Sequence, residues 1–257
     1  MPLVALHGLF DCSLGWKHVA AATGRPCVAF DLPGFGRSAL PAENRFASYA
    51  RDILGALDIL GVESFSLVGH SLGGAVAAEL SEQAQERTLN LTLLAPAGFG
   101  PVPVAELLGG SRLGRVVRLG VPLALSNPLT AAGIYATIVS HGHLPERQLL
   151  GRVIRRALRT APGAIAANEA IVAAAGDPQG FTRRPVHHDG PVSVLWGASD
   201  LLIPVSHAAR VCEALPQAKL TIWNGVGHHP QRERPRQLNE YLADSTRTYT
   251  KSLKAAA

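Results

Sequence analysis

A serine lies between two glycines in the segment Gly69-His70-Ser71-Leu72-Gly73. The apolar run Phe65–Val68 before it predicts a buried strand, and the pattern of Gly73–Gln85 after it predicts a helix. A serine at such a strand-to-helix turn is lifted above the sheet, and the tight turn requires small residues two positions before and after it. The first N–H groups of the helix also favour negative charge near the serine. The segment therefore predicts Ser71 as a nucleophile, whereas the alternative is a glycine-rich turn without chemistry.

A serine hydroxyl needs a general base, and the pattern favours His228. This histidine follows the last predicted strand, Leu220–Trp223, in a loop with a glycine directly before it. A loop at the carboxyl end of a parallel strand faces the same sheet edge as Ser71. His229 is the rival, but a proline follows it. We interpret the pair at 187–188 as structural or surface residues.

An imidazole base needs a carboxylate that holds its tautomer, and Asp200 is predicted to supply it. It follows the predicted strand Val192–Trp196, although an aspartate there can also be a helix cap or turn residue. Acyl transfer further needs N–H donors for the oxyanion. We predict the backbone N–H of Leu72 as one donor and that of Leu9 as the other, with Phe10 as the alternative to Leu9. No metal or organic cofactor is expected for this chemistry.

Six short apolar runs alternate with amphipathic helical patterns, which predicts an α/β fold with a doubly wound, mostly parallel sheet of about six strands. The predicted strands are Leu3–Leu6, Cys27–Phe30, Phe65–Val68, Leu91–Leu94, Val192–Trp196 and Leu220–Trp223. The predicted helices of the sheet layers are Arg51–Leu60, Gly73–Gln85, Ser206–Leu215 and Pro235–Tyr249. Residues 98–187 contain helical patterns without a convincing strand, and such a stretch is far longer than an ordinary connection. We therefore predict a core domain of residues 1–97 and 188–257 and an inserted helical cap, or lid, of residues 98–187.

Composition excludes several classes of protein. The 257 residues carry 24 Lys and Arg against 19 Asp and Glu, but these charges do not form the aromatic-interleaved basic runs of a nucleic-acid site. The three cysteines are scattered, which argues against a disulfide framework or a zinc site. The first residues lack the basic region of a signal peptide, and no stretch approaches the ~20 apolar residues of a membrane span. We expect a cytoplasmic protein with no nucleic-acid or membrane partner.

Taken together, these segments resemble the α/β-hydrolase fold family, in its capped carboxylesterase and lactonase-like branch. The resemblance spans residues 3 to about 242 and is carried by His7-Gly8, Asp31-Leu32-Pro33-Gly34-Phe35-Gly36-Arg37-Ser38, the turn at Ser71, Gly197 to Asp200, and Gly227-His228. Family members usually carry two strands before the His-Gly strand, whereas here that strand begins at residue 3, so we expect either a sheet that has lost them, as in minimal lipases, or a truncated sequence. Ala75 stands where menaquinone-pathway relatives usually carry arginine, and a serine nucleophile argues against dehalogenases and epoxide hydrolases, which have aspartate there.

The expected function is that of a serine hydrolase, a carboxylesterase that cleaves small to medium carboxylic esters through an acyl-enzyme on Ser71. The alternatives are enol-lactone hydrolysis, carbon–carbon bond hydrolysis or a lyase reaction with the same triad, and a ligand-binding module with vestigial activity. The partner is then a small-molecule ester or lactone. The usual strand order leaves Cys27–Phe30 at the sheet edge, where another chain could pair with it. Because this strand is short and lies between Pro26 and Pro33, which discourage such pairing, we expect a monomer, with a dimer as the alternative.

Overall fold

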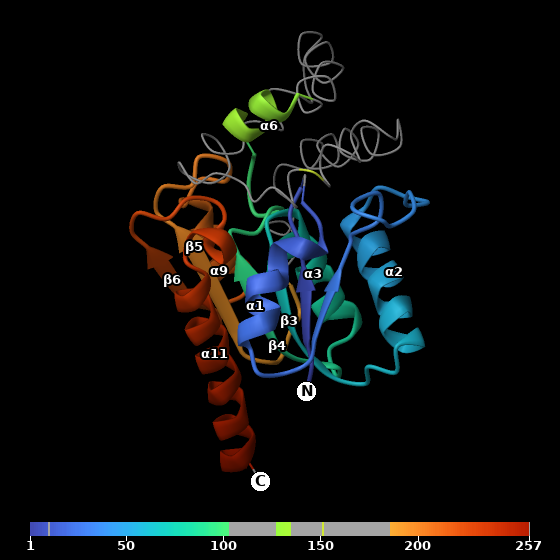
Figure 1. Ribbon diagram of the computed structural model, residues 1–257. Helices are drawn as coiled ribbons and strands as arrows, with labels where there is room; N and C mark the ends of the chain where they lie inside the picture. The colour runs from blue at the N-terminus through green and yellow to red at the C-terminus, as the bar shows by residue number, and fades with distance from the viewer. Residues whose placement is uncertain (10, 103–126, 135–150, 152–185, 257) are drawn as a thin grey trace.

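A computed structural model describes residues 1–9, 11–102, 127–134, 151 and 186–256 (Figure 1). Its centre is a six-stranded sheet in the order β2-β1-β3-β4-β5-β6. The strands are β1 (Leu3–Leu6), β2 (Cys27–Phe30), β3 (Phe65–His70), β4 (Thr88–Leu94), β5 (Val192–Gly197) and β6 (Lys219–Trp223). All five neighbouring pairs are parallel. The predicted fold class is confirmed, and β2 lies at one end of the sheet as expected.

The register aligns the carboxyl ends of the central strands. Leu6 at the end of β1 pairs with Gly69 of β3, and His70 at the end of β3 pairs with Leu94 of β4. Leu94 in turn pairs with Leu195 of β5. The loops that leave these strands therefore start side by side at one edge of the sheet, where ligands bind in open α/β sheets.

Helices cover both faces of the sheet (Figure 1). They are α1 (Lys17–Ala22), which follows the 3-10 helix η1 (Ser13–Trp16), then α2 (Phe46–Ile59), α3 (Leu72–Gln83), α9 (His207–Ala214), α10 (Pro230–Glu233) and α11 (Pro235–Ala256). One core cluster packs α2, α3 and α9 against one face, and a second packs α1 and α11 against the other. Strand residues alternate between the clusters: Val4 and Leu6 belong to the first, whereas Leu3 and Ala5 belong to the second. This alternation follows from the two-residue period of a strand and explains why β1 is apolar throughout.

Most helix boundaries lie within one or two residues of the sequence-based expectations, but two of them differ by more. Helix α2 begins at Phe46 rather than Arg51, because Ser48, Tyr49 and Ala50 are also buried against the core. Helix α11 continues beyond Tyr249 to Ala256. The short helices α1 and α10 were not predicted, because four to six residues are too few for a periodic pattern to stand out.

Most of the predicted cap, residues 98–187, lies outside the described residues. Within it the structure describes a helix, α6 (Pro128–Ile134), which Figure 1 draws beyond the carboxyl ends of the strands. The division into core and cap therefore stays a prediction. None of the helices in the described part of the chain combines the length and apolar character needed to cross a membrane.

Candidate active site

Ser71 occupies a strained turn between β3 and α3. Its φ of 55° and ψ of −119° lie in a region that residues other than glycine rarely adopt, at a cost of about 1–3 kcal/mol. Hydrogen bonds hold this conformation: the Ser71 N–H donates to the Leu94 carbonyl at 2.9 Å, and the Ser71 carbonyl accepts the N–H groups of Gly74, Ala75 and Ala97 at 2.8, 3.2 and 3.0 Å. The side chain is therefore presented at a defined position at the edge of the sheet.

Glycine at three positions makes this turn sterically possible. A Cβ on Gly69 would collide with the carbonyl oxygen of Gly73, and a Cβ on Gly73 would collide with the carbonyl oxygens of Leu6 and His7. These contacts are the physical reason for small residues two positions before and after Ser71, as the sequence predicts. Gly8 is less tightly enclosed, but a Cβ there would still lie 2.9 Å from His70 Nδ1 and 3.0 Å from the Cβ of Ser71. The loop after β1 therefore lies directly against the serine.

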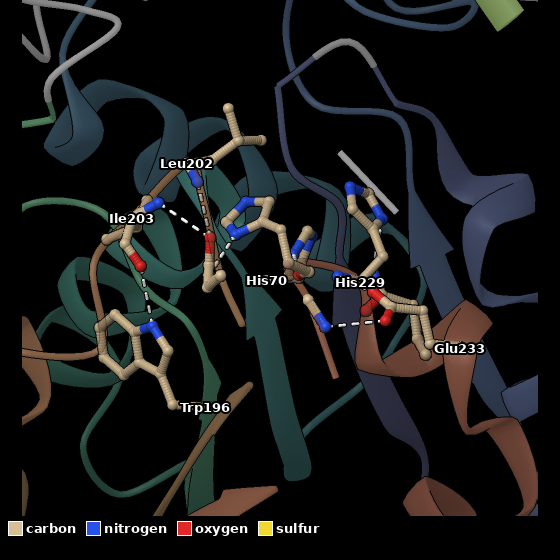
Figure 2. Close-up of polar contacts among 10 residues, drawn as sticks. His70, Trp196, Leu202, Ile203, His229 and Glu233 are labelled. Carbon is tan, nitrogen blue, oxygen red and sulfur yellow. Dashed lines mark hydrogen bonds and ion pairs between the residues drawn. The ribbon is translucent and has the colours of Figure 1, made fainter. Parts of the chain in front are cut away.

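Asp200 and His228 form a buried pair. His228 Nδ1 lies 2.7 Å from Asp200 Oδ2, and both side chains are almost fully buried. The other carboxylate oxygen, Oδ1, accepts the N–H groups of Leu202 and Ile203, each at 2.9 Å. The Ile203 carbonyl accepts the indole N–H of Trp196 at 3.0 Å, which ties this loop to β5 (Figure 2). Because the carboxylate only accepts hydrogen bonds, Nδ1 carries the proton and Nε2 is left as the basic nitrogen.

His228, the predicted base, lies beside the turn that carries Ser71, although the two residues are far apart in sequence. His70, the residue before Ser71, donates its Nε2–H to the His228 carbonyl at 2.6 Å. The two rings are 4.6 Å apart between centroids. The structure thus brings the predicted Ser71, Asp200 and His228 to one place at the carboxyl edge of the sheet.

His229, the rival base, has a different environment. Its ring is buried 4.4 Å from that of His70, and the hydrogen bond of Asp200 goes to His228. Burial and the neighbouring histidines hold the pKa values of both His70 and His229 well below the ordinary value. Both rings are therefore neutral at neutral pH. The geometry favours His228 as the base, as predicted.

Of the two predicted oxyanion donors, Leu72 follows the serine directly, and Leu9 follows Gly8, which packs against Ser71. Within the described part of the chain, no hydrogen-bond acceptor faces the N–H of Leu72 or that of Leu9. His7 orders the loop that carries Leu9, since its Nδ1–H donates to the Gly8 carbonyl at 2.7 Å and its Nε2 accepts the Leu32 N–H at 3.0 Å. Burial lowers the pKa of His7, which keeps its ring in the neutral form that this pattern requires. The alternative donor, at position 10, lies outside the described residues.

Three charged residues near the site were not predicted. Glu233 accepts the N–H groups of Gly227 and His229, and Arg232 forms an ion pair with Asp11 at 2.5 Å. Arg232 therefore joins the segment after the base to the loop that carries Leu9. A signal was present in the sequence: an Arg-Glu pair lies four and five residues after the base, between two prolines. Nothing local distinguishes such a pair from an exposed one.

Among the described residues, one group of three side chains could approach a metal ion. It consists of His70, His228 and His229, whose candidate ligand atoms all lie within 4.8 Å of one another. Each of the three rings uses one nitrogen in a hydrogen bond. The expectation that the chemistry needs no metal stays a prediction.

Comparison with known proteins agrees with the fold. A sequence model of the alpha/beta hydrolase fold matches residues 1–235. The chain is 30% identical over 246 residues to the dihydrolipoyllysine-residue acetyltransferase component of the acetoin cleaving system of Pseudomonas putida. The aligned region covers 94% of this chain and 62% of that protein. The chain thus spans under two thirds of the length of that relative.

Two further proteins are similar over nearly the whole chain. The 2-hydroxy-6-oxononadienedioate/2-hydroxy-6-oxononatrienedioate hydrolase of Paraburkholderia phymatum is 27% identical over 259 residues, which are 94% of this chain and 85% of that protein. The solved structure of a thermophilic esterase from Thermogutta terrifontis superposes with a TM-score of 0.74 at 21% identity, and covers 97% of this chain and 90% of that one. At this identity the structural likeness shows the fold.

Proposed function

The chain belongs to the α/β-hydrolase fold family, and on that premise we propose that it is a serine hydrolase that cleaves small to medium carboxylic esters. The observation that carries the proposal is the buried bond of 2.7 Å between His228 Nδ1 and Asp200 Oδ2 beside the strained turn of Ser71. A purely structural turn does not need a strained serine next to an oriented imidazole. An acyl-transfer enzyme needs both.

The proposed reaction has two steps. In the first, Ser71 Oγ attacks the ester carbonyl while His228 Nε2 takes the hydroxyl proton, and the oxyanion accepts the N–H groups of Leu72 and Leu9. The intermediate collapses, the bond to the alcohol breaks, and Nε2 returns the proton to the leaving oxygen. In the second step, water gives a proton to Nε2 and attacks the acyl carbon. The bond between this carbon and Ser71 Oγ then breaks, Nε2 returns the proton to Oγ, and the acid is released. Asp200 holds the ring and stabilises the imidazolium that forms in each step.

The size limit on the substrate rests on the predicted cap, because a cover over the sheet edge excludes water and restricts acyl length. The similarity to the Paraburkholderia phymatum hydrolase supports a second candidate, hydrolysis of a carbon–carbon bond in a 2-hydroxy-6-oxo acid by the same triad. Enol-lactone hydrolysis and a lyase reaction are further uses of the triad. A binding module with vestigial activity is the remaining alternative.

Labelling with a fluorophosphonate probe tests the enzyme class. The wild type should be labelled, Ser71→Ala should not, and the exposed Ser206→Ala should behave as the wild type. Ser71→Ala should lower kcat for p-nitrophenyl butyrate by a factor on the order of 10⁴ to 10⁶. Wild-type protein that resists the probe would point to the binding module.

A substrate panel then tests the reaction. It contains p-nitrophenyl esters with acyl chains from two to sixteen carbons, a lactone, and a 2-hydroxy-6-oxo-dienoate. We expect the highest kcat/KM at a short or medium acyl chain. A maximum at sixteen carbons would refute the size limit, and a higher kcat/KM for the dienoate would replace ester hydrolysis by carbon–carbon hydrolysis.

For its partners, we propose that the protein acts as a monomer on a small molecule, without nucleic acid or membrane. Light scattering at micromolar concentration tests the oligomeric state, and a stable dimer would contradict this proposal. The exposed backbone edge of β2 is the first place to look for the contact in that case.

A further inference from the structure

The backbone on both sides of His228 is held by one buried carboxylate. Glu233 Oε2 accepts the Gly227 N–H at 2.7 Å, and Oε1 accepts the His229 N–H at 3.0 Å. Figure 2 shows Glu233 directed at the backbone next to His229. Its side chain is buried, and no lysine, arginine or histidine of the described chain forms an ion pair with it. Because a buried charge without compensating hydrogen bonds is costly, these two N–H groups account for its place in the fold.

His70 holds the same segment at a third point. Its Nε2–H donates to the His228 carbonyl at 2.6 Å, so the three consecutive groups Gly227 N–H, His228 C=O and His229 N–H are all engaged. Two of these bonds go to Glu233 and one goes to the neighbour of the nucleophile. The backbone of the base is thus connected to the turn of Ser71 and to the helix that follows the base.

The other contacts of this segment come from its two sides. The segment lies in the loop after β6, which includes Gly225 with a φ of +65°, and it belongs to no strand or helix. After the base, the N–H groups of Arg232 and Glu233 donate to the His229 carbonyl at 2.9 Å each. Before the base, the Ser199 N–H donates to the Val226 carbonyl at 2.9 Å, and Gly197 packs against the Val226 and Gly227 carbonyls. The Glu233 carboxylate adds a bond to an N–H on each side of the imidazole.

We propose that Glu233 is a positioning residue for the base, which fixes the backbone of residues 227–229 so that His228 meets both Asp200 and Ser71. This inference rests on the proposed function. Glu233 touches no reacting atom and acts through His228. A displacement of about 1 Å in a catalytic group costs about 10²-fold in rate, so loss of this hold should appear in kcat. Substrate binding should change little.

The test exchanges the carboxylate for an amide of the same shape. In Glu233→Gln, the backbone N–H of either Gly227 or His229 faces the side-chain NH₂ group. Because both groups are hydrogen-bond donors, that hydrogen bond is lost. The matched control is Glu240→Gln, an exposed glutamate on α11. Steady-state kinetics with p-nitrophenyl butyrate are measured per active site, well below the melting temperature of each variant. We expect kcat to fall by about 10- to 100-fold for Glu233→Gln, with KM within about threefold and the control unchanged.

Two further measurements separate positioning from stability. Glu233→Asp keeps the charge but is one methylene shorter, so it should reach one N–H and lose less activity than Glu233→Gln. Proton NMR of the His228 Nδ1–H, which is bonded to Asp200, should show a shifted or exchange-broadened resonance in Glu233→Gln and an unchanged one in the control. A purely structural role would lower the melting temperature and leave both kcat and this resonance unchanged.

The outcomes are distinct from those of the proposed function. Wild-type protein without esterase activity and without Ser71 labelling would refute the function, while the NMR comparison would still test the hold on His228. A kcat within twofold of the wild type, with an unchanged resonance, would overturn the positioning role of Glu233. Failure of both variants to fold would also overturn it, because the carboxylate would then serve the stability of the whole domain.

Discussion

The exchange Asp200→Asn tests the orientation of the base with almost no change in shape. The carboxylate of Asp200 has two different tasks: Oδ1 accepts the Leu202 and Ile203 N–H groups, and Oδ2 accepts the His228 Nδ1–H. The amide that replaces it has one oxygen and one NH₂ group. Which of the two faces His228 decides the outcome.

The backbone decides this orientation. If the amide oxygen stays at the Oδ1 position, both backbone hydrogen bonds survive and the NH₂ group faces His228 Nδ1. The opposite orientation leaves two buried N–H groups unsatisfied, at about 1–3 kcal/mol each, to regain a single bond to His228. The first orientation is therefore favoured. His228 Nδ1 must then accept a hydrogen bond, so the proton moves to Nε2, which can no longer take the proton of Ser71.

The expected loss in kcat is about 10⁴-fold, the effect of a wrong imidazole tautomer, or about 5.5 kcal/mol in the barrier. Stability should change little, because the two backbone bonds are kept. The assay is hydrolysis of p-nitrophenyl butyrate, with Asp52→Asn on the exposed side of α2 as the control. Thermal melting follows the fold, and mass spectrometry checks that the amide has not reverted to the acid. A folded variant with kcat within tenfold of the wild type would refute the role of Asp200.

Two further predictions concern stability. Gly73→Ala places a methyl group against the Leu6 and His7 carbonyls and should lower the free energy of unfolding by about 1–3 kcal/mol or more, whereas Gly55→Ala, with nothing within 4 Å, should raise it by about 0.5–1 kcal/mol. Equal midpoints of urea unfolding for the two variants would contradict this packing. Burial lowers the pKa values of His70 and His229, so at acidic pH the unfolded chain binds more protons than the folded chain. The free energy of unfolding should therefore be highest above pH 6.5, the ordinary pKa of histidine, and should decrease as the pH falls below it. The expected loss between pH 6.5 and 5.5 is about 1 kcal/mol for each histidine, and unfolding midpoints that do not change over this interval would show that these rings are already charged in the fold.

The parts of the site that depend on a few neighbouring residues could be read from the sequence. The strand before Ser71, the helix after it and the small residues around it are all encoded within about twenty positions, and the steric reason is now visible at Gly69 and Gly73. The six strands are likewise apparent as short apolar runs. Because the carboxyl ends of parallel strands share one edge, the sequence also predicted that Asp200 and His228 would face Ser71.

The remaining features depend on contacts between distant segments, which no local pattern encodes. The bond between His70 and His228 joins residues 158 positions apart. Whether His228 or His229 receives the Asp200 carboxylate is decided by the path of the loop, since the two residues are chemically identical. Glu233 and Arg232 resemble surface charges in the sequence. Only when β1, β3 and β6 bring their loops together does Glu233 become a buried partner of the base loop and Arg232 a partly buried partner of Asp11. A local pattern can identify which residues are able to do the chemistry, whereas the residues that hold them in place are determined by the tertiary structure.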